Sequence, residues 1–486
     1  MELKVILILI LAAIVSVAIG LVTNVVSSFI PIPQSTKQKI LWILALIALA
    51  PLSALIALLL QAPIPDALAE ACKGISTSDS NFSTGEKLLI PQKENARLYE
   101  RKIYANNGRI TGDSVLLAAV VPADENARPE AAGAILAGVA DAQEQFNQRR
   151  EDPTSSDTAK PLRVLVVNDS NTVEGAKQVA CQIARDYKDV VGIIGHHSSD
   201  ASKAAVDIYN KAGLAMITPT STSTSLNQST VGKVFFRSTY SSRELADVLA
   251  KHIEGLNVGK IAIFYDEGEY STNIRGDFIK SLKDKNIIHP IPFDNLQPVN
   301  YSEKSVPKSL PAEVKSVIFF SSGGRRGTNE RAIRIIEYLK DSGRDLKIFG
   351  GNALYEGETL AKGKKKIENL VLVVPWFGFP KYAYRETTFD GKEGGQIGWR
   401  TANSFDATRA FLRAISLIAR NSETVNRQTI LEKLPSVNLP ANATSGEPLR
   451  FEAGQRQGGE PVLVQVVPKS NQVSCGFEVC FQPLQR

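Results

Sequence analysis

The sequence has few of the side chains on which metal sites usually depend. Its 486 residues include four histidines and four cysteines. The cysteines have none of the paired spacings of common zinc sites, and four histidines are too few for a histidine-rich metal site. The net charge of +6 is spread thinly, and no run of basic residues alternates with aromatic ones. We therefore expect no bound metal and no nucleic-acid partner.

Three sequence signatures of enzymes are also missing. Residues 357–364 resemble a phosphate-binding loop, but they have one residue too many and lack the hydroxyl after the lysine. Two histidines follow Gly195, where the backbone of a dinucleotide-binding loop has to approach the pyrophosphate closely. The Gly-x-Ser-x-Gly elbow of the α/β-hydrolases does not occur in the sequence. His196 and His197 stand beside two serines, but loop neighbours seldom face each other and the sequence shows no orienting acid. We expect no catalytic residue and no cofactor, and an enzyme on an α/β scaffold is the least favoured alternative.

Two apolar stretches without charge open the chain, at 5–26 and 40–60. Each can span a bilayer, which takes about 20 residues. A cleavable signal peptide is the alternative for the first stretch, although its apolar part exceeds the usual length. Lys37 and Lys39 lie between the stretches, so the positive-inside rule places that loop in the cytoplasm. We predict a two-span anchor over 1–61 in the cytoplasmic (inner) membrane, with the remaining chain on its extracytoplasmic, periplasmic side.

The cysteines allow one short disulfide. Cys475 and Cys480 are close enough to form a small loop in an oxidising compartment, and two unlinked thiols are the alternative. Ala69-Glu70-Ala71-Cys72 resembles a lipoprotein cleavage site, but Ala69 stands where a larger aliphatic residue is usual. We therefore expect no lipid on Cys72.

From residue 114 onward, apolar strands alternate with amphipathic helices. The chain is too long for one ordinary core, and the alternation occurs in two sets. This pattern predicts an α/β protein with two lobes, each a parallel sheet flanked by helices. We predict a tether over 62–113, a two-lobed domain over 114–467 and a C-terminal tail over 468–486. Within that domain, lobe 1 covers about 114–237 and 376–435, and lobe 2 covers about 238–375 with late strands at 449–467.

Two strands near the middle of the chain end in polar loops. The apolar run 190–194 leads into Gly195 and a His-His-Ser-Ser turn, and the run 214–217 leads into hydroxyl-bearing residues at 220–225. Open parallel sheets bind ligands at the carboxyl ends of their strands. These loops therefore predict a cleft for a small molecule.

The order of these elements resembles the type I periplasmic binding proteins, in the branched-chain amino-acid-binding branch that serves ABC transporters. The residues that carry the resemblance are 138–142, 168–169, 192–196, 207–209, 216–219, 236–237, 261–270, 405–407 and 451–466. The resemblance covers about 114–467. It implies two lobes joined by three hinge strands, with a solute held between them.

The resemblance also implies a set of ligand contacts. Ser199 and residues 220–222 would hold a carboxylate with hydroxyls and helix N-terminal amides, although Ser199 also fits a helix cap. Tyr270 would form an aromatic wall. The family usually places an acid for the ligand's ammonium where this chain has Asn352, so Asp200 is a possible substitute, while Arg325 and Arg326 would favour an anion. The predicted contacts are His197, Ser198, Ser199, Thr220, Ser221, Thr222, Tyr270, Ser322, Gly323 and Asn352.

We therefore predict a membrane-anchored extracytoplasmic receptor for an amino acid or a similar small polar or carboxylate solute. Its expected partner is an ABC permease. The alternative is a sensor that signals to a membrane partner.

Overall fold

The computed structural model describes residues 67–91, 97–125, 127–151, 158–256, 258–283, 288–292, 306–323, 327–378, 398–470 and 475–484. Contacts divide the chain into Met1–Glu70 and Ala71–Arg486, and the fold below is that of the second unit. The expected spans at 5–26 and 40–60 lie outside the described residues. Among the helices that are described, none is long and apolar enough to cross a membrane.

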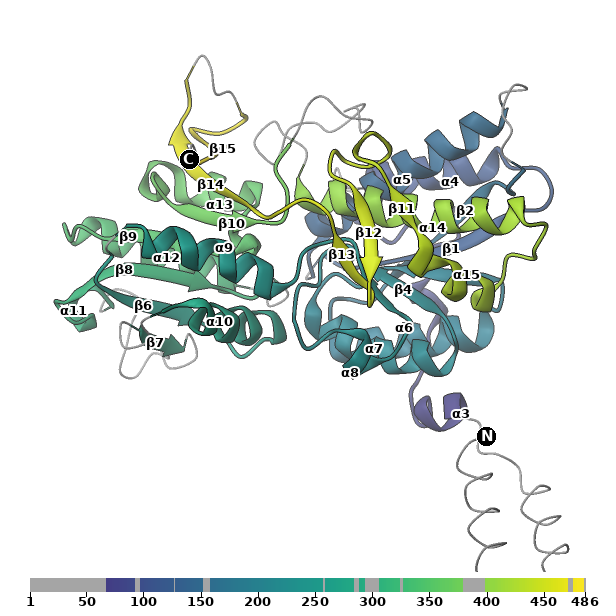
Figure 1. The fold of residues 1–486 in the computed structure, drawn as a ribbon, viewed down its shortest axis with the longest axis horizontal. Coiled ribbons are helices and arrows are strands. Elements are labelled where there is room, and N and C mark those ends of the chain that lie inside the picture. Colours follow the sequence, from purple (N-terminus) through teal and green to yellow (C-terminus); the bar gives the residue numbers. More distant parts are fainter. Residues whose placement is uncertain are drawn as a thin grey trace, which may run out of the picture. The chain divides into compact units, whose positions relative to one another are not determined.

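Lobe 1 contains a five-stranded parallel sheet of order β2-β1-β3-β4-β5 (Figure 1). Its strands are nearly continuous apolar runs because helices cover both faces. The strands are β1 (Val115–Val121), β2 (Leu162–Asn168), β3 (Val190–Ile194), β4 (Ala215–Thr218) and β5 (Phe235–Arg237). The helices are α5 (Pro129–Glu151), α6 (Val173–Asp186), α7 (Ser199–Lys211), α8 (Gln228–Val231), α14 (Trp399–Arg420) and α15 (Arg427–Lys433).

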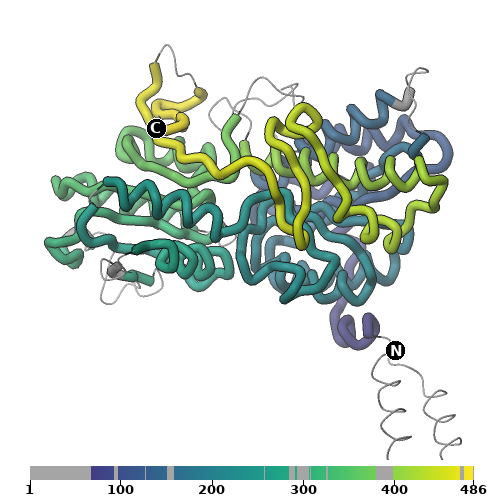
Figure 2. The backbone as a smooth tube through the Cα atoms, in the orientation of Figure 1, coloured from purple at the N-terminus to yellow at the C-terminus, as the bar shows by residue number. Residues whose placement is uncertain are grey.

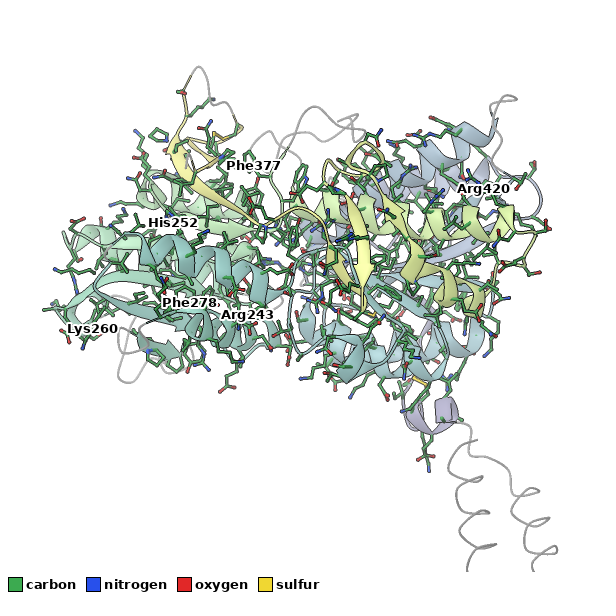
Figure 3. All side chains as sticks on the ribbon, in the orientation of Figure 1. Arg243, His252, Lys260, Phe278, Phe377 and Arg420 are labelled. Atoms are coloured by element: carbon green, nitrogen blue, oxygen red, sulfur yellow. A yellow bond between two sulfur atoms is a disulfide. The ribbon has the colours of Figure 1, made fainter. Side chains whose placement is uncertain are left out.

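Lobe 2 contains a seven-stranded sheet of order β15-β14-β10-β9-β8-β6-β7, in which β14 and β15 run antiparallel to their neighbours. The strands are β6 (Lys260–Tyr265), β7 (Ile288–Pro292), β8 (Val314–Phe320), β9 (Lys347–Gly350), β10 (Val371–Val374), β14 (Val462–Pro468) and β15 (Val479–Pro483). The helices are α9 (Ser242–Glu254), α10 (Glu269–Ser281), α11 (Val306–Ser309), α12 (Thr328–Asp341) and α13 (Gly357–Gly363). Phe278 and Phe377 are buried in this lobe, whereas Arg243 and Lys260 are exposed (Figure 3).

The chain crosses between the lobes three times, as the resemblance implies. It enters lobe 2 after β5 and returns to lobe 1 between β10 and α14. It leaves lobe 1 again before β14, where the C-terminal part of the backbone passes to the lobe 2 sheet (Figure 2). Solute-dependent motion of one lobe against the other would occur at these crossings.

The late strands divide differently from the prediction. A small sheet consists of β11 (Asn438–Leu439), β12 (Leu449–Glu452) and β13 (Gln455–Gln457). Leu449 and Phe451 pack into the core of lobe 1, so only the strand that begins at Val462 joins lobe 2. The apolar pattern identifies a strand, but it does not identify the core that the strand joins. Within the expected tail, β15 extends the lobe 2 sheet, and the Cys475–Cys480 disulfide is present.

The segment expected as a tether is attached to lobe 1 from Cys72 onward. It contains α3 (Ala67–Ala71) and α4 (Arg97–Gly108), and Tyr99 and Ile103 of α4 are buried in the lobe 1 core. The Glu100 carboxylate accepts the backbone N–H groups of Leu89 and Ile90 at 2.8 and 2.9 Å. A disulfide joins Cys72 to Cys181 in α6. The polar composition of this segment did not predict these contacts, because a few buried apolar residues are enough to attach the segment to lobe 1.

Candidate functional site

The two lobes enclose a cavity at the carboxyl ends of their parallel strands. In both sheets the strand order reverses beside the first strand, which is where open α/β sheets bind ligands. The cavity leaves about 30 Å³ of free space, because the lobes are in contact around it. Its lining residues are His197, Ser198, Ser199, Asp200, Thr220, Tyr270, Ser322, Gly323, Asn352, Ala353, Trp399 and Arg400. All ten predicted contacts except Ser221 and Thr222 are among them.

The loop after β3 begins with a glycine that the structure requires. Gly195 has a φ of +139°, and a Cβ atom there would lie 2.5 Å from the carbonyl oxygen of Val120. Any larger residue would push the loop away from β1. The glycine therefore fixes where the two following histidines lie.

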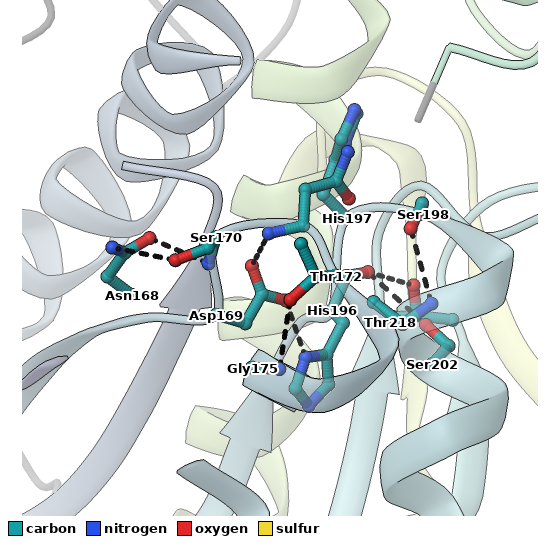
Figure 4. A network of polar contacts seen from close by, with 12 residues as sticks. Asn168, Asp169, Ser170, Thr172, Gly175, His196, His197, Ser198, Ser202 and Thr218 are labelled. Carbon is teal, nitrogen blue, oxygen red and sulfur yellow. Dashed lines mark hydrogen bonds and ion pairs between the residues drawn. The ribbon is translucent and has the colours of Figure 1, made fainter. Parts of the chain in front are cut away.

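His196 belongs to the interior of lobe 1. Its Nδ1 lies 2.7 Å from Oδ2 of Asp169 (Figure 4). Its Nε2 lies 3.0 Å from the hydroxyl of Tyr209. Asp169 is the orienting acid that the sequence did not reveal, because it follows a different strand. All three side chains are fully buried, and the second ring nitrogen faces a tyrosine and not a serine. The group stabilises the loop and does not form a nucleophile–base pair.

His197 lies on the other side of the loop and lines the cavity. The side chain is 5% exposed, and neither ring nitrogen has a hydrogen-bond partner among the residues that the structure describes. Burial, together with the positive charges of Arg400 and Arg128, holds the pKa of the His197 imidazole well below its ordinary value of 6.5. The ring is therefore neutral, and it offers one donor and one acceptor.

The serines at the start of α7 have different roles. Ser198 is the helix cap, because its Oγ accepts the backbone N–H of Ala201 at 3.2 Å. Ser199, which the sequence also allowed as the cap, is the first helical residue and lines the cavity. The helix therefore presents a hydroxyl and the positive end of its dipole to the cavity.

The hydroxyl-rich loop after β4 contributes one lining residue from the predicted set. Thr220 lines the cavity and donates its hydroxyl to the carbonyl oxygen of His197 at 2.7 Å. The Oγ of Ser221 lies 2.6 Å from the Oγ of Ser202 in α7, so Ser221 positions the loop from the side that faces away from the cavity. The Oγ1 of Thr222 is buried without a partner in the described structure, outside the cavity lining. The sequence pointed to this loop, but it could not show which of its hydroxyls turn toward the cavity.

Lobe 2 supplies a tyrosine and two short turns. The Tyr270 hydroxyl donates to Oδ1 of Asn352 at 2.7 Å, and burial raises the pKa of Tyr270 above its ordinary value, so the phenol stays protonated. Gly351 permits this contact, because a Cβ atom there would lie 2.2 Å from the Tyr270 hydroxyl. The Asp266 carboxylate accepts the N–H groups of Gly268 and Ser322 at 2.8 and 2.6 Å. Asp266 thereby fixes the turn that presents Ser322 to the cavity.

Trp399 and Arg400 line the cavity but were not predicted. Both side chains are 2% exposed and lie at the start of α14, directly after the second crossing. Arg400 packs over the Trp399 ring, with its guanidinium carbon 4.7 Å from the ring centroid. The amphipathic pattern of α14 predicts a helix on lobe 1, and it does not show that the first turn reaches the cleft. The only sequence signal was the rarity of tryptophan, which occurs three times in the chain.

Contacts between α7 and α10 hold the cavity closed. We call Asp200, Lys203, Ser223, Ser225 and Glu269 the α7–α10 latch. Lys203 Nζ lies 2.8 Å from Glu269 Oε2, and the hydroxyls of Ser223 and Ser225 donate to Glu269 Oε1. The Asp200 carboxylate accepts the backbone N–H of Glu269 at 3.2 Å. Because α10 has no side-chain cap of its own, this carboxylate of lobe 1 caps a helix of lobe 2.

Replacing Glu269 by glutamine should shift the lobes toward an open arrangement. Burial alone would raise the pKa of Glu269, but Lys203 and the Ser225 hydroxyl outweigh it, so the pKa lies below its ordinary 4.5. The latch is therefore complete above pH 4.5 and is lost as the pH falls through the lowered pKa. Since Lys203 is half exposed, we expect an effect of about 1 kcal/mol or less.

Small-angle scattering as a function of pH measures this shift. The radius of gyration of the Glu269→Gln variant should be larger at neutral pH and should respond less to acid. Asp207→Asn is the control, because Asp207 pairs with Lys211 inside α7. If the radius of gyration of the two variants depends on pH in the same way, the α7–α10 latch does not contribute to closure.

Comparison with known proteins agrees with this geometry. Residues 142–343 match the family described as the receptor family ligand binding region. A leucine-, isoleucine-, valine-, threonine- and alanine-binding protein of Pseudomonas aeruginosa is 24% identical over 215 residues, which are 44% of this chain. That match spans about half of the relative, 55% of its length.

Two solved structures share the two-lobed arrangement. An ABC transporter substrate-binding protein from Desulfitobacterium hafniense in complex with Leu is 18% identical, with a TM-score of 0.56 over 76% of this chain and 100% of that one. A solute-binding protein of R. palustris in complex with benzoate is 12% identical, with a TM-score of 0.55 over 77% of this chain and 98% of that one. At these identities the likeness concerns the fold. The chain is a two-lobed α/β protein with the fold of the type I periplasmic binding proteins, and its residues 142–343 are similar to the receptor family ligand binding region.

Proposed function

We propose that the protein is an extracytoplasmic receptor that holds a small carboxylate-bearing solute, an amino acid or an organic acid, between its lobes. The main support is the interlobe cavity, whose lining comes from both lobes and includes the buried ring nitrogens of His197, which have no hydrogen-bond partner in the described part of the chain. Native proteins rarely leave buried polar atoms without partners. A polar solute at this position would supply them.

The first turn of α7 is the proposed carboxylate site. Ser199 offers a hydroxyl there, and the helix N-terminus offers backbone amides and a favourable dipole. A carboxylate bound in this way touches lobe 1 first and reaches lobe 2 only when the lobes close. The solute then shifts the open–closed equilibrium by the difference between its affinities for the two arrangements.

The cellular setting and the partner also belong to the proposal. The disulfides Cys72–Cys181 and Cys475–Cys480 are of a kind that persists in oxidising compartments, which supports an extracytoplasmic position. An anchor over 1–61 would hold the receptor at the cytoplasmic membrane. Because the relatives are named as parts of ABC transporters, an ABC permease is the proposed partner. If deletion of the protein leaves solute uptake unchanged, the partner is a membrane signalling protein instead.

A solute screen on the full-length chain, purified in mild detergent, tests the receptor function. Thermal shift and calorimetry should cover amino acids, amides, ureas, small carboxylates and oligopeptides. At a concentration of about 100 times its Kd, a solute that binds only the folded state stabilises it by about 2.7 kcal/mol. If no class of solute stabilises the fold at millimolar concentration, the proposed function fails.

Ser199→Ala should weaken the binding of any carboxylate found in the screen by about tenfold, because one hydrogen bond to a charged group is lost. Ser436→Ala is the matched control, since Ser436 is exposed and donates only to the Lys433 carbonyl oxygen. An unchanged affinity in the Ser199 variant would contradict the proposed carboxylate position.

A further inference from the structure

Two buried residues that line the interlobe cavity have hydrogen-bonding atoms without partners. The Nε1–H of Trp399 and both ring nitrogens of His197 have no hydrogen-bond partner within the described ranges. Trp399 is 2% exposed and His197 is 5% exposed, and both line the same cavity. Because buried polar atoms without partners are rare in native proteins, these three atoms indicate where a polar group of a ligand lies.

The three atoms together require a partner that both accepts and donates. The indole Nε1–H of Trp399 is only a donor. Burial holds the pKa of the His197 imidazole well below its ordinary value of 6.5, so the ring is neutral, and one of its nitrogens donates while the other accepts. A ligand group at this position therefore has to accept the Trp399 N–H and to donate a hydrogen bond to His197.

A charged group meets only half of this requirement. A carboxylate accepts but does not donate, so it would leave the unprotonated nitrogen of His197 without a partner. An ammonium group donates but does not accept, so it would leave the Trp399 N–H without one. Asp200 is the single acid among the described residues that line the cavity, and its carboxylate already accepts the backbone N–H of Glu269 at 3.2 Å. A carboxamide accepts through its oxygen, donates through its nitrogen and carries no charge that burial would penalise.

We infer that the solute carries a carboxamide, which accepts the Trp399 Nε1–H through its oxygen and donates an N–H to His197, while its carboxylate lies at the N-terminus of α7 near Ser199. His197 and Ser199 both lie at the junction of β3 and α7 and both line the cavity, so a short solute reaches both groups. Since the free space between the lobes is only about 30 Å³, the solute enters with the lobes apart. The inference rests on the proposed function and narrows its solute class to short carboxylates with an amide at the other end.

Calorimetry on the full-length chain, purified in mild detergent, tests the inference with solutes that differ at one end. Succinamate is compared with levulinate, in which a methyl group replaces the amide nitrogen, and with succinate and γ-aminobutyrate, which carry a second carboxylate and an ammonium group. Malonamate and glutaramate vary the length. We expect the best amide to bind about tenfold more tightly than levulinate, because the ketone cannot donate to His197. If levulinate, succinate or γ-aminobutyrate binds as tightly as the best amide, the inference is overturned and the receptor function stands.

Two variants separate the two hydrogen bonds of the carboxamide. Trp399→Phe keeps an aromatic ring but deletes the N–H, so it should weaken succinamate and levulinate alike, by about fivefold, since both place a carbonyl oxygen there. His197→Phe removes the ring nitrogens, so it should abolish the preference for succinamate over levulinate. His252→Phe is the matched control, because His252 is a half-buried residue of α9 outside the cavity lining (Figure 3).

Each outcome of these measurements bears on the inference or on the receptor function. A preference for the amide that persists in His197→Phe overturns the inference. Should His197→Phe fail to fold, Trp399→Phe decides the matter, and unchanged affinities for both solutes in that variant overturn it. An absence of binding by every solute to the unsubstituted protein counts against the receptor function itself.

Discussion

Replacing Arg456 by methionine should lower the free energy of unfolding by about 3–5 kcal/mol. The Nη1 of Arg456 lies 3.0 Å from Oδ2 of Asp406, and the two side chains are 1% and 0% exposed. Burial raises the pKa of the Asp406 carboxyl, and the positive charge of Arg456 opposes that rise. Without the guanidinium, a buried carboxylate would remain with no opposite charge in contact, and this is the main source of the expected loss.

The same cluster joins three parts of the chain that lie next to the crossings between the lobes. Arg456 lies in β13 and Asp406 lies in α14. The backbone carbonyl oxygen of Ser238, which follows β5, accepts a hydrogen bond from Arg456 Nη1 at 2.6 Å. Asp406 also accepts the backbone N–H of Ser445 at 2.7 Å. The substitution should therefore loosen the hinge as well as the core of lobe 1.

Urea unfolding measures the loss, with Arg450→Met as the control, because Arg450 is an exposed residue of the neighbouring strand β12. The double variant Arg456→Met/Asp406→Leu should recover much of the stability, since removing both charges removes the cost of burying one alone. A loss in Arg456→Met no larger than in Arg450→Met would refute the assignment.

Removing the Cys72–Cys181 disulfide should cost about 5 kcal/mol of unfolding free energy. The bond closes a loop between residues 109 positions apart, and the chain-entropy estimate grows with the logarithm of loop length. The bond also fastens the segment before lobe 1 to α6. The Cys72→Ser/Cys181→Ser variant should therefore unfold at lower urea, and proteases should cut residues 72–91 first.

The second disulfide provides an internal control for this prediction. Cys475 and Cys480 are five positions apart, so the same estimate gives about 2 kcal/mol for the Cys475→Ser/Cys480→Ser variant. Its loss should affect β15 at the C-terminus and leave lobe 1 intact. If the two double variants lose equal stability, the Cys72–Cys181 bond does not constrain the fold in the way proposed.

Much of the site follows from local sequence patterns. The apolar run of β3 followed by Gly195, and the run of β4 followed by hydroxyls, identify two strand ends, and parallel sheets bring such ends to one edge. For this reason most predicted residues, including His197 and Ser199, do line the cavity. The Ser221 side chain points away from the cavity, toward Ser202. The direction of each side chain depends on how the loop packs, and the number of hydroxyl-bearing residues in the loop does not predict that packing.

The sequence by itself determined the two-lobed α/β plan and the strand ends that line the cleft, because each depends on residues close together in the chain. It allowed the short Cys475–Cys480 disulfide, with two unlinked thiols as the alternative, and the structure contains the bond. Only the tertiary structure decided that Trp399 and Arg400 reach the cavity, that Asp169 holds His196 and that Cys72 pairs with Cys181. These contacts join residues far apart in sequence, up to 109 positions for the disulfide. Periodicity records which face of an element is apolar, but the partner of that face is chosen when the whole chain packs.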